Sequence, residues 1–591
     1  MANYVFIKTR QSADSQKIIH KLNEVCELLT PASIKSQSQN SVEVWPKDKN
    51  AFYAIQNSEY IAKPDQEGLV IGWIDQSSGN GSKTLGADID GSYAIIKNDK
   101  ETTTFFSDQF GSRTLWYFYD DNRLIVSTSQ RAIVALKRRF NLNEKAIAWY
   151  LSSGCQGPFI SWDQDIIQVL PDTQYILNAS DWQLSLQQKA DMSLPLSGTT
   201  KMSKYLKTYQ KQVRKSLKQV INDYPKGKVL LPLSGGLDSR LLLALSKRSK
   251  LGDSLTLVNW GISKPKEVYD DKKAAKRVAN FYSKGLLDKQ LPTGINDYDK
   301  VLNQFVEAGE GRIDHFNAFA DSFKMWTEFF QEGYRIIIRG DIPFPAGLCI
   351  NEIQIRQMMG LELLNDYVNI NDFNLSRYAA LQTATLSKSI ANESLIRWRD
   401  RAFINMRVPM VHAAFSQLTN SFTESKAPMF DWSLFKLYMG LPDKDKGNKR
   451  HIYKLWKKYD HSGVSSKAEP SLASLDSYFD SSLGKEYLMH KLVNIKEIEM
   501  IDLALINSVY NAISKQSTSD DLLATKTSIR SIISQKAKRL LSKHLPVLPR
   551  AYLKSKTANN ISATALAYRI VLIEKIITMY QSDQSYIEVN K

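Results

Sequence analysis

Cysteine is scarce in this chain of 591 residues, which contains three: Cys26, Cys155 and Cys349. They lie far apart and follow no metal-ligand spacing, so the sequence predicts neither a disulfide framework nor a cysteine-held metal. Long apolar runs are also missing, and the segment from Met1 to Lys8 lacks the basic stretch and apolar core of a leader peptide. We therefore expect a cytoplasmic protein without a membrane span.

Negative charge is in short supply, with 61 acidic residues against 78 lysines and arginines, a formal net charge of +17. Such an excess favours acidic partners, which include nucleic acid, an acidic glycan and an anionic membrane surface. The lysines are scattered, however, apart from clusters at 264–276, 444–458 and 536–543, several of which are typical of solvated helix faces. A dedicated nucleic-acid role is therefore the less favoured interpretation.

The chain is longer than one ordinary core accommodates, so at least two domains are expected. Up to about Leu186 it shows short alternating strands separated by Asn, Asp and Gly turns. The predicted strands cover 70–74, 92–96, 102–106, 115–119 and 124–127, and a helix is expected from Asn143 to Leu151. The polar segment from Met192 to Ser203 is typical of a linker.

From Lys204 onward helical patterns dominate, interrupted by apolar strands at 229–233, 255–258 and 335–338. This alternation predicts a parallel sheet with helices on both faces. The predicted organisation is thus an α+β domain at 1–190, a linker at 191–203 and an α/β domain with a helical C-terminal part at 204–591.

The most informative segment is Ser-Gly-Gly-Leu-Asp-Ser at 234–239. It follows an apolar strand at 228–233 and precedes a helical pattern at 240–245. A small glycine-rich turn between a strand and a helix presents backbone N–H groups and the positive end of the helix dipole to an anion, and here predicts a pyrophosphate site. Asp238 would repel a bare phosphate, which favours its role as a ligand of a bridging Mg²⁺. The segment lacks both the Gly-Lys-Ser/Thr ending of kinase-type loops and the Gly-x-Gly-x-x-Gly spacing of dinucleotide sites.

The segment 234–239 resembles the signature of the PP-loop ATP pyrophosphatases, which split ATP between its α and β phosphates. Over nearly the whole chain, the order of segments resembles glutamine-dependent asparagine synthetases. The matching segments are 90–94, 107–113, 127–129, 146–150, 166–171, 259–261, 270–279 and Glu424 to Asp431 followed by Leu441-Pro442. The resemblance implies an N-terminal Ntn-hydrolase-like domain of layered β-sheets and an adenylating PP-loop domain.

Two departures from this family are visible. Ala2 and Asn3 follow Met1 where glutamine-using members place a cysteine nucleophile, and Ile71 to Asp75 replaces the family's Asn-Gly-Glu pocket segment. The N-terminal domain is therefore expected to lack glutaminase activity, as in β-lactam synthetases and lasso-peptide cyclases. After the strand at 335–338, the family's acidic turn is replaced by Arg339 to Gly347, which keeps one acidic residue, Asp341, and contains two prolines.

The candidate site residues follow from the turn and the resemblance. Asp238 and Asp341 are the expected Mg²⁺ ligands. A lysine should meet the charge that builds on the phosphates, and Lys467 is the first candidate, with Lys449 and Lys454 as rivals. The expected ATP-binding residues are Leu233, Ser234, Gly235, Gly236, Leu237, Asp238, Ser239, Asn259, Trp260, Gly261 and Gly340. Glu424 and Asp431 are expected to tie helices near the site, and Arg397 to Arg401 is interpreted as an exposed amphipathic face or an acidic-substrate patch.

The resulting hypothesis is an ATP- and Mg²⁺-dependent carbon–nitrogen ligase that adenylates a carboxylate and transfers it to a nitrogen nucleophile. Its acceptor is expected to be aspartate, a peptide or small precursor, or a uronic acid of a polysaccharide. The nucleophile is expected to be ammonia or a substrate amine, and a homodimer is an expected assembly. Two alternatives stay open: a PP-loop enzyme that modifies RNA, and a non-catalytic protein that keeps the fold.

Overall fold

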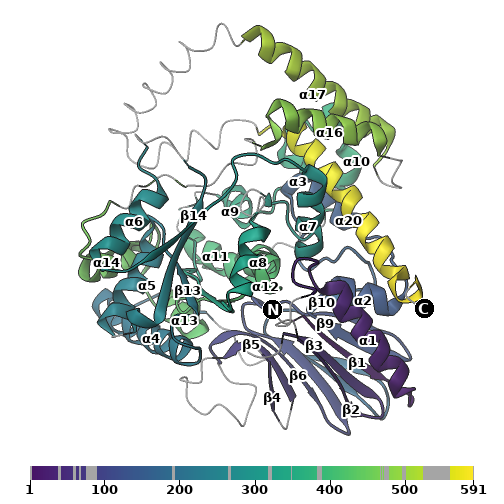
Figure 1. Cartoon of the computed structure of the whole chain (residues 1–591), viewed down its shortest axis with the longest axis horizontal. Helices are drawn as coiled ribbons and strands as arrows, with labels where there is room; N and C mark the ends of the chain where they lie inside the picture. Colours follow the sequence, from purple (N-terminus) through teal and green to yellow (C-terminus); the bar gives the residue numbers. More distant parts are fainter. Residues whose placement is uncertain are drawn as a thin grey trace.

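The structure is a computed structural model of the chain, drawn whole in Figure 1. It describes residues 3–36, 41–57, 62–65, 68–74, 89–188, 194–249, 251–263, 268–316, 322–345, 347, 349, 351–382, 389–465, 468, 470, 478–495, 501–523 and 559–589. The lysine cluster at 536–543 therefore lies outside the described residues.

The N-terminal part contains two six-stranded antiparallel sheets. The first has the order β10-β8-β9-β1-β3-β2 and the second the order β12-β11-β7-β6-β5-β4. The bounds in the first sheet are β1 (Tyr4–Thr9), β2 (Val42–Asp48), β3 (Ala51–Gln56), β8 (Trp116–Tyr119), β9 (Arg123–Ser127) and β10 (Ile167–Gln168). Those in the second are β4 (Ala62–Asp65), β5 (Gly68–Ile74), β6 (Gly91–Asn98), β7 (Thr102–Ser107), β11 (Thr173–Asn178) and β12 (Leu184–Gln188). The predicted β-rich layer is confirmed.

Strand β1 is buried on both faces, as its continuous apolar run requires. Tyr4 and Phe6 pack between the two sheets, whereas Val5 and Ile7 face the opposite side. That side is covered by α1 (Ser15–Leu29) and α2 (Gln130–Lys137), which contact each other. The predicted helix near 143–151 is confirmed as α3 (Glu144–Ser153).

A five-stranded parallel sheet in the order β15-β14-β13-β16-β17 forms the centre of the second part. Its strands are β13 (Val229–Pro232), β14 (Leu255–Gly261), β15 (Leu286–Gln290), β16 (Ile336–Ile338) and β17 (Glu424–Lys426). The three strands expected from the sequence are confirmed, and β15 and β17 extend the sheet at its two edges. Figure 1 shows α4, α5, α6 and α14 gathered around this sheet.

Helices make up most of the remaining described chain. The first elements are α4 (Met202–Asn222), α5 (Leu237–Arg248), η3 (Gly252–Ser254), α6 (Asp271–Phe281), α7 (Tyr298–Gly309) and α8 (Phe323–Gln331). The following elements are α9 (Glu352–Met359), η5 (Leu364–Asp366), η6 (Asn371–Phe373), α10 (Ser376–Ala379), α11 (Leu395–Ala402), the π-helix η7 (Phe403–His412) and α12 (Ala413–Asn420). The last are α13 (Trp432–Met439), η8 (Asp443–Asp445), α14 (Arg450–Tyr459), α16 (Ser482–Asn494), α17 (Leu503–Leu523) and α20 (Ala563–Val589). Within the described residues, no helix is long and apolar enough to cross a membrane.

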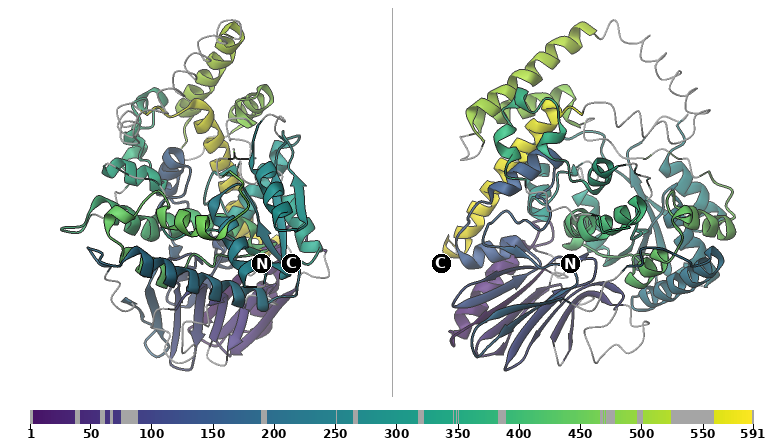
Figure 2. Two further views of the ribbon diagram at one scale, coloured as in Figure 1. Left: turned by 90° about the vertical axis from the view of Figure 1, so that its left-hand side faces the viewer. Right: turned by 180° about the vertical axis from the view of Figure 1, so that it is seen from behind.

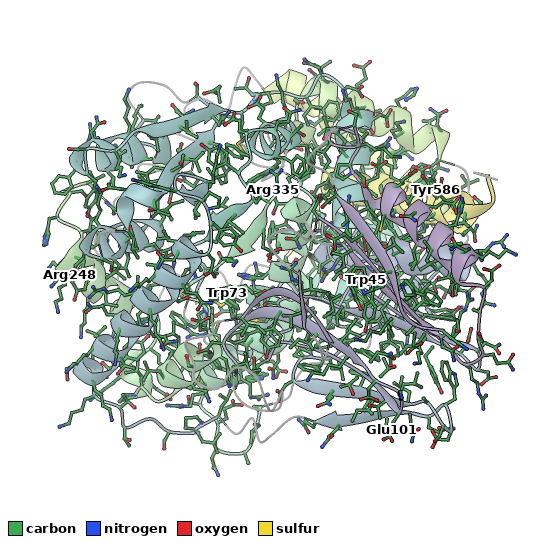
Figure 3. The ribbon with its side chains drawn as sticks, turned by 60° about the horizontal axis from the view of Figure 1, so that its bottom comes forward. Trp45, Trp73, Glu101, Arg248, Arg335 and Tyr586 are labelled. Atoms are coloured by element: carbon green, nitrogen blue, oxygen red, sulfur yellow. The ribbon has the colours of Figure 1, made fainter. Side chains whose placement is uncertain are left out.

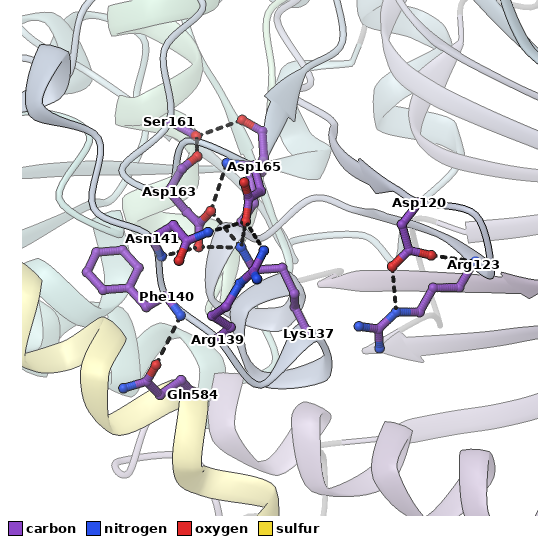
Figure 4. A network of polar contacts seen from close by, with 11 residues as sticks. Asp120, Arg123, Lys137, Arg139, Phe140, Asn141, Ser161, Asp163, Asp165 and Gln584 are labelled. Atoms are coloured by element: carbon purple, nitrogen blue, oxygen red, sulfur yellow. Dashed lines mark hydrogen bonds and ion pairs between the residues drawn. The ribbon is translucent and has the colours of Figure 1, made fainter.

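The long helix α20 connects the helical end of the molecule with the N-terminal sheets. In Figure 2 it runs, in yellow, from beside α16 and α17 to the N-terminal part. Arg131 of α2 pairs with Asp583 at 2.8 Å. Beside it, Lys137 pairs with Asp163 and Asp165, and the backbone N–H of Phe140 donates to Gln584 (Figure 4). The last helix thus belongs structurally to both parts.

The two parts also meet where residues in or next to β5, β6 and β7 contact β17 and α13. The carboxylate of Asp90 accepts hydrogen bonds from the N–H and hydroxyl groups of Ser433, at 2.8 and 2.5 Å. Arg113 forms a buried ion pair with Glu424. Trp73 lies at this boundary (Figure 3), where its ring centroid is 5.8 Å from the Nζ atom of Lys426. These contacts hold the N-terminal sheets against the edge of the parallel sheet.

Candidate functional site

The turn at 234–239 follows β13 and leads into α5, as its sequence predicts. Strand pairing extends to Leu233, whose N–H donates to Val258 at 2.8 Å. The side-chain amide of Asn259 in the neighbouring strand donates to the Leu233 carbonyl at 2.6 Å. Gly236 is the residue before the first turn of α5 and has an extended backbone. The turn therefore lies at the carboxyl end of a parallel sheet, where ligands of such folds bind.

The N–H groups of this turn donate to oxygen atoms of the protein itself. Gly235 donates to the carboxylate of Asp271 at 2.9 Å, and Gly236 donates to the Ser234 hydroxyl at 3.1 Å. The N–H of Ser234 donates to the Ser239 hydroxyl at 3.3 Å. A phosphate at this turn would replace these contacts or use other donors. Asp271 is a site feature that the sequence did not single out, although it opens the helix that follows β14.

Asp238, in the first turn of α5, forms an ion pair with Lys449. Its side chain is 22% exposed, and its Oδ1 atom has no hydrogen-bond partner among the described residues. Burial raises the pKa of the Asp238 carboxyl above its usual value, and the negative charge of Asp341 raises it further, whereas Lys449 opposes both. Asp238 is therefore a carboxylate with one oxygen paired and one oxygen available.

Lys449 reaches Asp238 from an unusual backbone position. Gly447, Asn448 and Lys449 have positive φ angles of 83°, 49° and 51°, and α14 begins directly after them. The left-handed region costs an L-residue other than glycine on the order of 1 kcal/mol. Such strain persists only where neighbouring contacts hold it, and it accumulates at functional sites. This turn directs the Lys449 ammonium toward the start of α5.

Gly340 and Asp341 follow β16 and lie beside the same helix start. A Cβ atom on Gly340 would approach the Cβ of Asp238 to 3.0 Å and the N atom of Ser239 to 3.2 Å. Asp341 is paired with Arg339 at 2.9 Å, and its charge acts on the carboxyl of Asp238. The absence of a side chain at Gly340 thus lets the segment after β16 pack directly against the start of α5.

The segment Asn259 to Gly261 ends β14, next to the turn. The Asn259 side chain is 5% exposed, and its Oδ1 atom has no hydrogen-bond partner in the described structure. Trp260 is half-buried and packs edge-on against Trp326, with ring centroids 5.5 Å apart. Trp260 thus already packs against another aromatic ring of the protein.

The three candidate lysines have different outcomes. Lys449 lies at the site, whereas Lys454 is an exposed residue of α14 and Lys467 lies outside the described residues. The neighbouring Ala468 is described, and a Cβ added to Gly235 would lie 2.5 Å from its Cβ. Of the two candidates that the structure describes, Lys449 is the one that contacts Asp238, and Lys467 stays a prediction. In the sequence, Gly447 and Asn448 directly precede Lys449. Both are residue types that accept positive φ angles, and this pair was the signal that could have indicated the unusual turn at Lys449.

The arginine-rich segment at 397–401 differs from both of its predicted interpretations. Arg397, Arg399 and Asp400 are buried, so the segment is neither an exposed face nor a substrate patch. The Arg397 guanidinium donates to the carbonyls of Met439 and Leu441 at 2.8 and 2.9 Å. Burial of these charges is tolerated because backbone oxygens and carboxylates surround them.

The residues expected to tie helices near the site have mixed outcomes. Glu424 joins β17 to Arg113 of the N-terminal part, which agrees with a structural role. Asp431 is fully buried and precedes the first residue of α13. Burial raises the pKa of Tyr209, and the charges of Asp238 and Asp431 raise it further, so Asp431 lies in the surroundings of the site.

The oxygen atoms at this site meet part of what Mg²⁺ requires. Asp238 and Asp341 supply carboxylate oxygens, and the unpaired Oδ1 of Asp238 is a free acceptor position. Mg²⁺ in nucleotide sites takes one or two carboxylates and completes its shell with phosphates and water. Among the described residues, no group of three or more His, Cys, Asp or Glu residues is arranged to hold a metal alone. The residues therefore fit a metal that arrives with a phosphate ligand.

No protein-family model and no curated protein matches this sequence. Among solved structures, the chain is similar to glutamine phosphoribosylpyrophosphate amidotransferase from B. subtilis complexed with ADP and GMP. That alignment has 10% identity, covers 44% of this chain and 67% of the other, and has a TM-score of 0.19. A second neighbour, described as the allosteric regulatory enzyme of purine biosynthesis, has 10% identity, covers 50% and 82%, and has a TM-score of 0.21. Similarity at this level carries no argument about activity.

Proposed function

We propose that this protein is an ATP- and Mg²⁺-dependent ligase that adenylates a carboxylate, releases pyrophosphate and transfers the acyl group to a nitrogen nucleophile. The observation that supports it is the convergence of Asp238, Lys449 and Asp341 at one end of a parallel sheet. They come from α5, the turn before α14 and the segment after β16. Two carboxylates and one ammonium beside a glycine turn suit a metal-bound polyphosphate better than a purely structural contact.

Each residue has a distinct role in this proposal. Asp238 and Asp341 would hold Mg²⁺, which when bound neutralises charge on the phosphates. Lys449 would leave Asp238 and face the negative charge that builds on the α-phosphate and the departing pyrophosphate. Asn259 to Gly261 would bound the nucleobase through the free amide oxygen and main-chain groups. The contact between Lys449 and Asp238 is then the resting arrangement of the site.

The nitrogen donor is proposed to be ammonia or an amine on the substrate. Cys26, the first cysteine of the sequence, is 1% exposed, and burial raises its pKa to about 12. A thiol in that environment is protonated at neutral pH and does not act as a nucleophile. The carboxylate remains one of the three classes given by the resemblance: aspartate, a peptide or small precursor, or a uronic acid in a polysaccharide.

AMP formation from radiolabelled ATP tests the proposal, with aspartate, peptide pools and uronic-acid polymers offered in turn as acceptors. We expect Mg²⁺-dependent AMP release with one acceptor class. Lys449→Met should reduce it by about a hundredfold, or roughly 3 kcal/mol of transition-state stabilisation. Lys454→Met is the matched control, because this exposed lysine lies one turn further along α14. Equal loss in the two variants, or no AMP with any acceptor, contradicts the proposal.

A second function, nucleotide-dependent binding without turnover, is favoured by one observation. The N–H groups of Gly235 and Gly236 and one oxygen of Asp238 are all engaged by protein groups. If these contacts persist when a nucleotide binds through other groups, the turn has no free donors for a departing pyrophosphate and the nucleotide would not be cleaved. Saturable binding of a fluorescent ATP analogue without AMP release in any acceptor pool would support this alternative.

A further inference from the structure

The turn that carries Lys449 is attached to the protein core at both ends. Before it, the side chain of Lys446 is fully buried, with its Nζ atom 3.5 Å from the carboxylate of Asp400 and 3.2 Å from the sulfur of Met439. After it, His451 is 1% exposed and lies against the ring of Tyr438, with centroids 5.4 Å apart. The Nζ atom of Lys446 lies 4.9 Å from the centroid of that same ring. Tyr438 of α13 therefore contacts both ends of the turn.

The residues between these attachments have the strained geometry described above. Gly447, Asn448 and Lys449 share positive φ angles, and the N–H of Arg450 closes the turn on the Gly447 carbonyl at 3.3 Å. Two of these three residues are not glycine, so the turn would relax if one attachment were released. A buried ion pair is weak as a source of stability, and a role in fixing one conformation is its better-attested use.

We propose that the buried pair Lys446–Asp400 is a positioning device that holds the turn at 446–449, and that it thereby sets the Lys449 ammonium against Asp238. This inference rests on the proposed function for its consequence in ATP binding. Lys446 itself lies in the core and has no contact with Asp238 among those described. It acts through the turn, and Lys449 is the residue that meets the phosphates.

The charges around Lys446 make the device sensitive to pH. Burial lowers the pKa of Lys446 to about 8, with Arg397 of α11 lowering it further, whereas Asp400 and Asp443 oppose the shift. Arg399 shares Asp400, and Tyr438 faces the ammonium from α13. Above about pH 8 Lys446 loses its charge and the attraction to Asp400 disappears, so Lys449 should be held less firmly.

Binding of Mg²⁺ and the fluorescent analogue mant-ATP to the full chain provides the first test. We expect Lys446→Met to weaken affinity by about tenfold in the wild-type background and by less than about twofold in a Lys449→Met background, because coupled residues are non-additive. The affinity of the wild type for mant-ATP should fall above about pH 8. Lys446→Arg should keep its affinity above that pH, since arginine stays charged. Additive effects, or an alkaline decline unchanged in Lys446→Arg, overturn the inference.

Crystal structures of the wild type and of Lys446→Met provide a test that needs no nucleotide. We expect the contact between Lys449 and Asp238 to be lost in the variant and kept in Lys454→Met. Retention of the contact in Lys446→Met overturns the positioning role. If the wild type fails to bind mant-ATP, the proposed function fails, whereas this structural comparison still decides the role of Lys446.

Discussion

The ammonium of Lys449 donates a hydrogen bond to the carboxylate of Asp238, although 211 residues separate the two in the chain. The contact joins the first turn of α5 to the turn before α14. It pairs the acidic residue of the glycine turn with a lysine from a remote segment.

Asp238→Asn should abolish Mg²⁺-dependent AMP formation and leave the fold intact. The substitution removes a charged ligand without opening a cavity, and the expected loss is about a hundredfold, or roughly 3 kcal/mol. Burial and the charge of Asp341 raise the pKa of the Asp238 carboxyl, which means that the folded protein disfavours its negative charge. Replacing the carboxylate by a neutral amide should therefore not lower the thermal midpoint of unfolding. AMP formation at the wild-type rate would contradict the metal role, and near-ultraviolet circular dichroism serves as the control for folding.

Asp341→Ala should raise the Mg²⁺ concentration needed for half-maximal binding of mant-ATP. The variant removes one of two carboxylates, and losing one ligand should shift that concentration by about tenfold. Because Arg339 loses its partner in the same variant, Arg339→Met is the matched control. An Mg²⁺ requirement that changes in Arg339→Met and not in Asp341→Ala would remove Asp341 from the site.

Gly340→Ala should weaken mant-ATP binding by about tenfold, or roughly 1.4 kcal/mol. Its added methyl group would lie 3.0 Å from the Cβ of Asp238, so the start of α5 must shift. Gly285→Ala is the control, because no atom lies within 4 Å of the Cβ it would add. Titration of both variants checks the prediction, and equal affinities would show that the close approach is unimportant.

The protein should release no glutamate from glutamine. Cys26 is buried and its pKa is raised to about 12, so its thiol stays protonated and inaccessible. An enzyme-coupled glutamate assay measures this, with Cys26→Ala as the comparison. Glutamate release that a thiol-blocking reagent abolishes would refute the prediction.

Stability should fall as the pH drops below about 6.5, because His451 is buried as a neutral ring. Burial lowers its pKa to about 3, so the unfolded chain binds a proton between these pH values and the folded chain does not. Neither ring nitrogen has a hydrogen-bond partner among the described residues, so His451→Phe loses no such bond. The thermal midpoint of His451→Phe should therefore change less between pH 6.5 and 4 than that of the wild type. Burial also lowers the pKa of His412 to about 4, and because both proteins contain His412, both keep its contribution to the pH dependence. His490→Gln, at an exposed position, should behave as the wild type does.

Local pattern alone predicted much of the architecture. Alternating strands before about Leu186 indicated the antiparallel layers, and the apolar runs at 229–233, 255–258 and 335–338 indicated the parallel sheet. These elements were predictable because side-chain period and turn residues are local properties. Strands β15 and β17 were not foreseen, because the edges of a sheet carry weaker apolar patterns. The contact between α20 and α2 was not predicted, because the apolar periodicity of a helix does not indicate which element it packs against.

For the site, the sequence by itself determined the glycine turn, the acidic residue within it and the position of both at the end of a strand. Tertiary structure decided which lysine faces Asp238, and it buried Arg397, Arg399 and Asp400, which their charge had placed at the surface. A turn can be predicted from sequence because adjacent residues in the chain determine its backbone angles. Pairing between Asp238 and Lys449 depends instead on how α14 packs against α5, and burial of a charge depends on partners that fold around it from distant segments.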